Sequence, residues 1–264
     1  MDQNRAYVSI VRIDGRAPLR IKATPGKLSL TPASHLCLDT IDRHGDLLHG
    51  QGIDWGSGSG VLAIAAATNP GVDLVVGLEV DRHDVTTART NAELNGVADR
   101  VVFLHSDGFE PFPGEDPSPL EELRDGAEFL IANPPSSTGD DGLGWRRRLL
   151  DSAREFLVAD AEVFLQVSRQ YGVARTEALA TDSGGYEYRG LLGTTDWAPF
   201  DQGRPDLRAA LDDYAAEEQR TGEPYPFLHP IEDRQITATE ATQIRDRDRS
   251  SPRSQWSMHR FVRV

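Results

Sequence analysis

The amino-acid sequence predicts an α/β fold in which a mostly parallel sheet carries helices on both faces. Between residues 50 and 170, strand-like apolar runs alternate with helix-like segments, the order that builds such a sheet. Four of the five strand-like runs are rich in Val, Ile, Leu and Phe, which is typical of strands buried on both faces. A length of 264 residues suits one such domain with an elaboration.

The expected strands are short, and the first of them carries the weakest apolar signal. They are GQGIDW (50–55), VDLVVGLEV (72–80), RVVFLH (100–105), AEFLIAN (127–133) and AEVFLQVS (161–168). Right-handed crossovers would lay these strands side by side, with the loops after them along one rim of the sheet. Ligands bind at that rim in such folds, so we expect the functional residues there.

Helices are expected between the strands, at residues 60–68, 84–96 and 142–159. Gly or Asp opens each segment, and Asn95-Gly96 is a stop signal for the second. Asp140 and Asp141 stand before the third helix, where we expect them to act as caps. Consecutive helical positions point in different directions, so the run from Arg146 to Arg148 is interpreted as a solvated face.

The texture of the sequence changes after residue 183. We expect a strand at 184–193, a helix at 205–220 and a closing strand at 255–264, and the charged patch at 245–254 is interpreted as an exposed loop. About sixty residues separate the two strands, and such an excursion either caps a pocket or packs on the surface.

These patterns divide the chain into four parts. They are an N-terminal segment that packs on or caps the core (1–48), the core itself (49–195), an insertion that is a possible substrate cap (196–254) and the closing strand (255–264).

The composition limits the possible partners. Acidic residues number 42 against 28 basic ones, and the formal net charge of −14 disfavours RNA as a partner unless basic residues gather on one face. Cys37 is the lone cysteine, which excludes an internal disulfide, and no metal-ligand spacing is present, so we expect no metal. No segment approaches the ~20 apolar residues that cross a bilayer, and a cytoplasmic protein without membrane contact is expected.

The stretch GQGIDWGSGSG at 50–60 carries the first motif, Asp54 followed by Gly56, Gly58 and Gly60. A dinucleotide-binding loop would read GxGxxG after an aliphatic residue and would hold a pyrophosphate. A carboxylate at Asp54 would repel that group and attract a cation. Glu79 ends the next expected strand, where a carboxylate can accept both hydroxyls of a ribose. The ligand is therefore expected to be a nucleoside with a positive charge.

This arrangement resembles the class I S-adenosylmethionine-dependent methyltransferases, in which the first motif has this form and the second strand ends in an acidic residue. The resemblance implies S-adenosyl-L-methionine as the cofactor. It also implies a Rossmann-like, doubly wound sheet of seven mostly parallel strands with helices on both faces and an antiparallel C-terminal strand.

The resemblance assigns the cofactor contacts by position. The three glycines would let the backbone approach the methionine part, and Asp54 would hold its amino group or an ordered water. Glu79, preferred over Asp81, would hold the ribose, and Asp107 would accept from the adenine amino group. Trp55 replaces the usual aliphatic residue of the motif, a change expected to affect packing only.

The second motif is Asn133-Pro134-Pro135, which resembles the NPPY-type motif of amino-methyltransferases. That group acts on exocyclic amines of adenine and guanine and on the glutamine amide of release factors. The lone pair of such a nitrogen is delocalised, so the nitrogen must be turned toward the methyl group. The Asn133 side chain, which also meets the cofactor, and the Pro134 carbonyl would hold its two N–H bonds as the catalytic pair. Such alignment can lower the activation barrier by ~7–11 kcal/mol.

The fourth motif position is Ser136, where the family has an aromatic residue that stacks on a planar substrate. Pro135 and Ser136 would contact the acceptor, and the missing ring would forgo the ~1–3 kcal/mol of base stacking. Trp145, Trp197 or Tyr225 could replace it.

The sequence therefore predicts N-methylation of an amine or amide of a small molecule or a protein side chain. The alternatives are an rRNA or tRNA base N-methyltransferase and a non-catalytic protein that binds S-adenosylmethionine.

Overall fold

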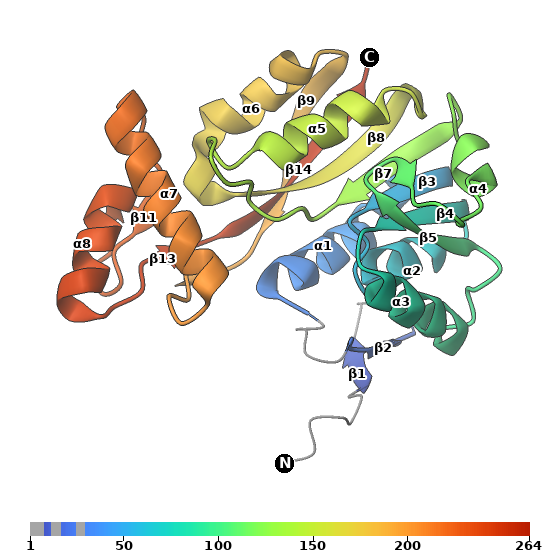
Figure 1. The fold of residues 1–264 in the computed structure, drawn as a ribbon, viewed down its shortest axis with the longest axis horizontal. Coiled ribbons are helices and arrows are strands. Elements are labelled where there is room, and N and C mark those ends of the chain that lie inside the picture. Colours follow the sequence, from blue (N-terminus) through green and yellow to red (C-terminus); the bar gives the residue numbers. More distant parts are fainter. Residues whose placement is uncertain (1–7, 12–16, 25–29) are drawn as a thin grey trace.

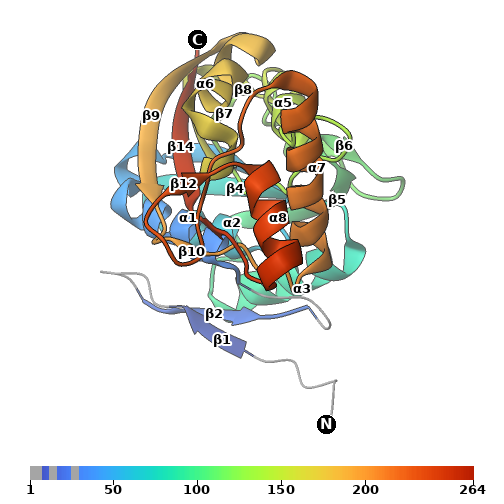
Figure 2. The same cartoon turned by 90° about the vertical axis from the view of Figure 1, so that its left-hand side faces the viewer.

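The structure, a computed structural model, describes residues 8–11, 17–24 and 30–264. An eight-stranded sheet forms its centre and carries helices on both faces (Figure 1). A four-stranded sheet with its own two helices lies at one end, and Figure 2 shows this end facing the viewer. The predicted α/β fold with a mostly parallel central sheet is confirmed.

The central sheet contains all five strands predicted between residues 50 and 170. In spatial order its strands are β6 (Glu110–Pro111), β5 (Val101–Asp107), β4 (Val72–Glu79), β3 (Gly50–Trp55), β7 (Ala127–Ala132), β8 (Leu157–Ser168), β14 (Trp256–Arg263) and β9 (Tyr186–Thr194). The middle five, from β5 to β8, are parallel, and β14 runs antiparallel to both of its neighbours. The expected antiparallel closing strand is therefore confirmed, and the two-residue β6 adds an eighth, edge strand to the seven expected.

The helices around this sheet form two layers. They are α1 (Pro32–Arg43), α2 (Val61–Ala67), α3 (Arg82–Leu94), α4 (Ser118–Glu121), α5 (Gly144–Ala153) and α6 (Gly172–Ser183). Successive β7 residues point to opposite faces: Phe129 and Ile131 pack with α1, α2 and α3, whereas Leu130 packs with α5 and α6. Every residue of the alanine-rich α2 is buried, which explains its lack of charge.

In the N-terminal segment, a hairpin lies against α3, and α1 packs on α2 and β14. β1 (Val8–Val11) and β2 (Leu19–Lys22) form an antiparallel hairpin. The side chain of Asn91 bonds to both backbone groups of Lys22, and Asn95 does the same for Arg20. These contacts hold the chain that leads to Thr24 beside the rim of the sheet.

The segment at 196–254 forms the second sheet and its helices. Its elements are β10 (Ala198–Pro199), α7 (Pro205–Thr221), β11 (Phe227–Leu228), β12 (Gln235–Ile236), α8 (Ala238–Asp248) and β13 (Arg253–Ser254). Glu218, a buried carboxylate of α7, accepts backbone N–H groups of Tyr225, Ala238 and Thr239 and so ties the segment together. Its apolar side chains continue the core that lies under α5 and α6.

Two sequence predictions are wrong, one for the helix at 142–159 and one for the charged patch at 245–254. The helix predicted at 142–159 ends at Ala153, because the carbonyl of Phe156 accepts from Gly126 and Ala127 and the chain then enters β8. The patch at 245–254 is not simply a loop: its first residues end α8, and its last two form β13 between β10 and β11. No helix in the described ranges is long and apolar enough to span a bilayer.

Candidate active site

The predicted site residues lie at or just after the ends of four neighbouring strands, β5, β4, β3 and β7, along one rim of the sheet. Trp55 at the end of β3 lies opposite Leu78 of β4 on one side and Ala132 of β7 on the other. The residues that follow these three positions are Gly56, Glu79 and Asn133. The parallel register alone therefore brings the glycine loop, the acidic strand end and the Asn-Pro-Pro turn together.

The glycine loop folds back onto β4 through its own backbone. The N–H groups of Gly56 and Ser57 both donate to the carbonyl of Leu78, at 2.9 and 3.0 Å. Gly56, Gly58 and Gly60 all have positive φ, which favours glycine. A Cβ on Gly60 would also lie 2.5 Å from the ring of Phe103, so packing requires glycine there. Gly56 and Gly58 border open space, whereas Gly60 packs against Phe103 and Ala88.

Asp54 lies beneath this loop rather than in it. The side chain is fully buried, one carboxylate oxygen accepts the N–H of Ala63 at 3.0 Å, and the other has no hydrogen-bond partner within the described part of the chain. Burial raises the pKa of Asp54 to about 7, the Ala63 N–H opposes this shift, and the nearby Glu79 adds to it. Asp54 lines none of the three cavities described below.

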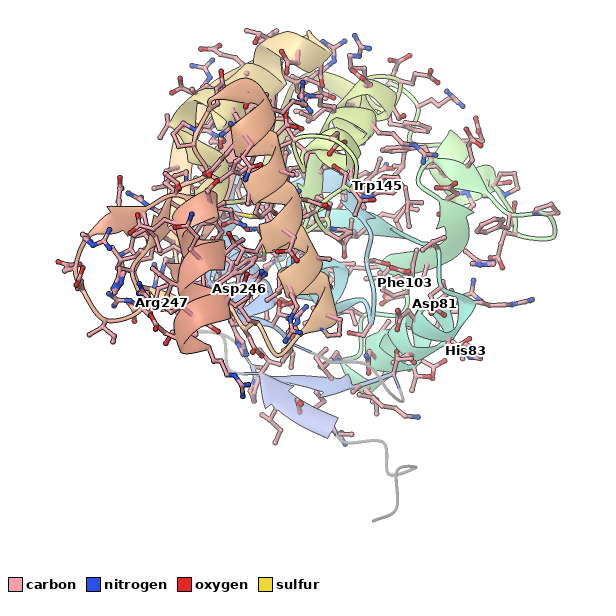
Figure 3. The ribbon with its side chains drawn as sticks, turned by 60° about the vertical axis from the view of Figure 1, so that its left-hand side comes forward. Asp81, His83, Phe103, Trp145, Asp246 and Arg247 are labelled. Carbon is pink, nitrogen blue, oxygen red and sulfur yellow. The ribbon has the colours of Figure 1, made fainter. Side chains whose placement is uncertain are left out.

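Glu79 is nearly buried at the end of β4 and holds the loop directly. Its two carboxylate oxygens accept the N–H groups of Gly58 and Asp81, each at 2.8 Å. Asp81 instead caps α3 by accepting the N–H of His83 (Figure 3). Glu79, and not Asp81, faces the rim.

Three cavities meet at the rim, and Asn133 lines all of them. The loop cavity, about 150 Å³, lies beside Thr24, Ser34 and Gly56 to Ser59. The strand-end cavity, about 520 Å³, is lined by Trp55, Glu79, Asp107 and Trp145, among others. The turn cavity, about 410 Å³, lies on the far side of Pro134 and Pro135. Asn133 is therefore the junction of the site.

Polar side chains in the walls of two of these cavities have no hydrogen-bond partner among the described residues or form a long ion pair. In the loop cavity, the hydroxyls of Thr24 and Ser57 are buried and have no hydrogen-bond partner among the described residues. In the strand-end cavity, Asp107 is half exposed and pairs with Arg148 at 3.3 Å. Trp55 lines the same cavity.

The Asn-Pro-Pro turn is held by Arg146, which the sequence placed wrongly on a solvated face. Arg146 is 1% exposed and donates to the carbonyls of Pro134, Pro135 and Gln166, at 3.0, 3.2 and 2.8 Å, and to the Gln166 side chain. No carboxylate of the described residues lies within ion-pair distance of it, and burial lowers its pKa. The Pro134 carbonyl, expected to bind the acceptor, thus already has one partner.

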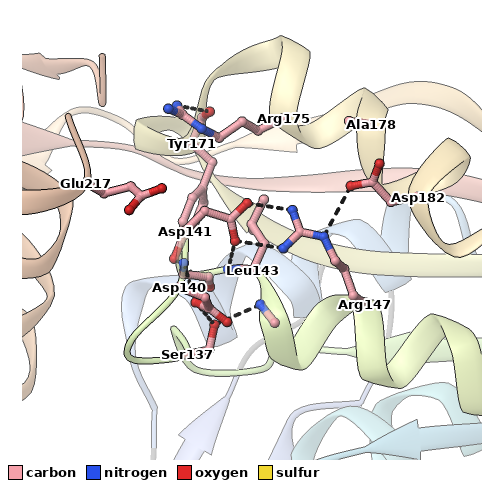
Figure 4. A network of polar contacts seen from close by, with 12 residues as sticks. Ser137, Asp140, Asp141, Leu143, Arg147, Tyr171, Arg175, Ala178, Asp182 and Glu217 are labelled. Atoms are coloured by element: carbon pink, nitrogen blue, oxygen red, sulfur yellow. Dashed lines mark hydrogen bonds and ion pairs between the residues drawn. The ribbon is translucent and has the colours of Figure 1, made fainter. Parts of the chain in front are cut away.

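The loop between the turn and α5 is fixed by two carboxylates. Asp140 accepts from Ser137 and from the N–H of Gly142, and Asp141 accepts from the N–H of Leu143 and from Arg147 (Figure 4). These residues do not cap α5, because its cap position is Leu143. They close the turn that precedes the helix.

Ser136 follows the turn, and its hydroxyl lies 2.8 Å from the hydroxyls of Tyr171 and Tyr214. None of the three aromatic residues named as replacements lines the turn cavity; Phe200 and Trp256 do. Both were missed because they lie far along the chain from the motif.

A local signal for Arg146 was nevertheless present. It stands in helical phase with Leu149, Leu150 and Ala153, and all four side chains are buried.

Comparison with known proteins finds similarity over part of the chain. A family profile described as ribosomal protein L11 methyltransferase matches residues 31–119, a range that contains the glycine loop and Glu79 and ends before Asn133. Curated proteins named ribosomal protein L11 methyltransferase are 40% identical in Haemophilus influenzae and 43% identical in Photobacterium profundum, each over 102 residues and 39% of this chain. The chain spans 30% of the length of these relatives.

Two solved structures extend the similarity. The 16S rRNA N2 methyltransferase of T. thermophilus, solved with AdoMet and guanosine, is 28% identical with a TM-score of 0.55, over 72% of this chain and 47% of that one. The YcgJ protein of Bacillus subtilis shares the fold at 12% identity, with a TM-score of 0.52 over 86% of this chain and 97% of its own.

The buried carboxyl of Asp54 predicts a pH dependence of stability. Its pKa of about 7 exceeds the ordinary 3.8, so between these values the folded chain keeps a proton that the unfolded chain has lost. The Asp54 contribution to stability therefore falls as the pH rises through this window and stays low above it. Asp54→Asn cannot ionise, so its free energy of unfolding relative to the unchanged chain should rise by about 2–3 kcal/mol from about pH 5 to about pH 8.

Urea unfolding of both proteins at the two pH values measures this difference. Asp107→Asn, which removes an exposed carboxylate from the same rim, controls for the change in net charge. A difference between Asp54→Asn and the unchanged chain that stays constant with pH would contradict the assignment.

Proposed function

We propose that this chain, which is an S-adenosylmethionine-dependent methyltransferase, transfers the methyl group to a nitrogen of a protein side chain held at Asn133. The observation that carries the proposal is the position of Asn133 at the junction of three cavities. Two of these cavities adjoin the glycine loop, and the third lies beyond the prolines. The comparisons support an enzyme, so a non-catalytic binding protein is not retained.

The loop and strand-end cavities suit the two halves of the cofactor. S-adenosylmethionine, when bound, supplies an electrophilic methyl group on a cationic sulfur. In this proposal Gly56 and Gly58 let the backbone approach its methionine part, and the unpartnered hydroxyls of Thr24 and Ser57 offer it hydrogen bonds. The unpaired buried charge of Asp54 favours a cation above it.

The larger strand-end cavity would take the nucleoside. Each Glu79 oxygen accepts one backbone N–H and keeps a lone pair for a ribose hydroxyl. Asp107 is exposed at the cavity wall, where its weak pair with Arg148 leaves it free to accept from an adenine amino group.

The turn cavity would take the acceptor, with Pro135 and Ser136 in its wall. The Asn133 side-chain oxygen and the Pro134 carbonyl would receive the two N–H bonds of a neutral amide or amine and so direct its lone pair at the methyl group. A carbonyl oxygen has two lone pairs, so Pro134 can accept from Arg146 and from the acceptor together. The insertion closes this cavity with α7, as a substrate cap would.

The acceptor class is argued from the relatives and the cavity. The named relatives act on a ribosomal protein or on rRNA, and a small metabolite, considered from the sequence, gains no support. Ser136 leaves no stacking ring at the motif, which favours an amide side chain over a base. A ribosomal acceptor would also agree with the cytoplasmic location expected from the lone Cys37.

A guanine amine in RNA is the second candidate. The T. thermophilus rRNA enzyme was solved with guanosine, and Phe200 and Trp256 line the turn cavity, where either ring could meet a base. With an rRNA enzyme among the similar structures, the net charge of −14 does not by itself exclude RNA.

Methyl transfer to bacterial ribosomal subunits tests the acceptor. With methyl-tritiated S-adenosylmethionine, we expect label that stays with protein after ribonuclease digestion and is released by protease. Label confined to RNA would favour the second candidate. Subunits that take up no label in either fraction would contradict a ribosomal acceptor.

Asn133→Ala should separate binding from chemistry. Loss of the clamp should slow methyl transfer by at least about 100-fold, because the acceptor nitrogen is no longer oriented. One lost hydrogen bond should weaken S-adenosylhomocysteine binding by at most about tenfold. Gln243→Ala, which removes an exposed side-chain amide on α8, is the control. A variant that turns over at the normal rate would remove Asn133 from the mechanism.

Glu79→Gln should weaken cofactor binding instead. The amide keeps only one acceptor oxygen and loses the charge, so it cannot hold both the loop and a ribose. We expect the dissociation constant for S-adenosylhomocysteine, measured by calorimetry, to rise by at least about tenfold. Asp81→Asn keeps a good helix cap and should leave the constant unchanged. Equal constants for all three proteins would place the ribose elsewhere.

A further inference from the structure

Three hydroxyl groups from distant parts of the chain meet beside the Asn-Pro-Pro turn. Ser136 lies 2.8 Å from both Tyr171 and Tyr214, and the two phenolic oxygens lie 2.7 Å from each other. Ser136 follows β7, Tyr171 follows β8, and Tyr214 belongs to α7 of the insertion. Both tyrosines are almost completely buried. We call these three residues the hydroxyl cluster.

The three hydroxyls of the cluster lie within hydrogen-bond distance of one another, and the surroundings hold them in place. The Tyr171 hydroxyl also reaches the carbonyl of Gly142, which closes the loop after the turn. The Tyr214 ring stacks on Tyr225 at 4.8 Å and meets Tyr171 edge-on at 5.6 Å. Because Glu218 fixes Tyr225 from the same helix, the Tyr214 hydroxyl has little freedom to move.

The cluster and Arg146 hold the turn at two successive places. Arg146 binds the carbonyls of Pro134 and Pro135, and the cluster binds the next side chain, Ser136. Proline fixes φ at both middle positions, so little rotation remains between these points and Asn133. Holding Ser136 therefore limits the movement of the backbone that carries Asn133.

We propose that Tyr214 is a positioning residue, through which the insertion fixes the turn that carries Asn133. This inference rests on the proposed role of Asn133 and extends it, because it gives the insertion a part in aligning the acceptor as well as in covering it. Serine at position 136 is then a requirement of this arrangement, since its small hydroxyl fits between two phenols.

Tyr214→Phe tests the proposal with little change in packing, because it removes one oxygen and keeps the ring. Tyr186→Phe is the matched control: it also removes one buried phenol hydroxyl, but that hydroxyl donates to the carbonyl of Leu150 in α5 rather than to the cluster. Ser136→Ala and the double variant Ser136→Ala/Tyr214→Phe show whether the two hydroxyls act together.

Amide hydrogen exchange of the full-length chain gives a readout that needs no substrate. The N–H of Ser137 donates to Gly142, so its exchange reports on the closure of the turn. We expect Tyr214→Phe to speed exchange over residues 136–144 by about fivefold, the value of one ordinary hydrogen bond, and Tyr186→Phe to leave it unchanged. Exchange in Tyr214→Phe equal to that of the unchanged chain would overturn the proposal.

Methyl transfer to ribosomal subunits gives the second readout. Tyr214→Phe should lower kcat by about fivefold with the dissociation constant of S-adenosylhomocysteine unchanged, and Ser136→Ala should add little to it in the double variant. Additive losses of kcat would contradict joint action. If the unchanged chain transfers no methyl group, the proposed function fails, whereas the exchange experiment still decides whether Tyr214 positions the turn.

Discussion

The parallel register of β3 with its two neighbours is the constraint on which the site depends. Because Trp55 lies opposite both Leu78 and Ala132, the next residue of each strand emerges at the same place. The glycine loop then folds onto β4 by two hydrogen bonds to one carbonyl, and Glu79 accepts a third loop N–H. A slip of one residue in either pairing would turn these side chains to the opposite face of the sheet.

Two buried charges lie on opposite sides of Asn133, and each is tolerated for a different reason. Burial raises the pKa of Asp54 under the loop, and the nearby Glu79 adds to this shift, so Asp54 is easier to protonate than an exposed carboxyl. Arg146, behind the turn, keeps its charge because neutral oxygen acceptors surround it. Asp54 suits a cationic ligand above the loop. Arg146 donates to the carbonyls of two prolines, which have no N–H groups of their own.

The sequence predicted the sheet and the rim better than the acceptor side. Runs such as VDLVVGLEV are apolar enough to identify buried strands, and loops after such strands must share a rim. Arg146 was misplaced because its charged neighbours outweighed its helical phase with Leu149 and Leu150. Tyr214, Phe200 and Trp256 reach the turn only through tertiary packing, for which no local pattern exists. The end of α5 was likewise missed, because the chain after it enters β8, which pairs with β7, and helix propensity does not reveal that pairing.

The apolar side chains of the insertion belong to the same cluster as Leu149 and Phe261, so the insertion shares its core with the central sheet. Its tyrosines meet the turn and the loop before α5 at once. Exchanging this segment for an unrelated one would therefore leave phenol-sized voids in the host. A workable chimera must transplant Ser136 and Tyr171 together with the donor helix.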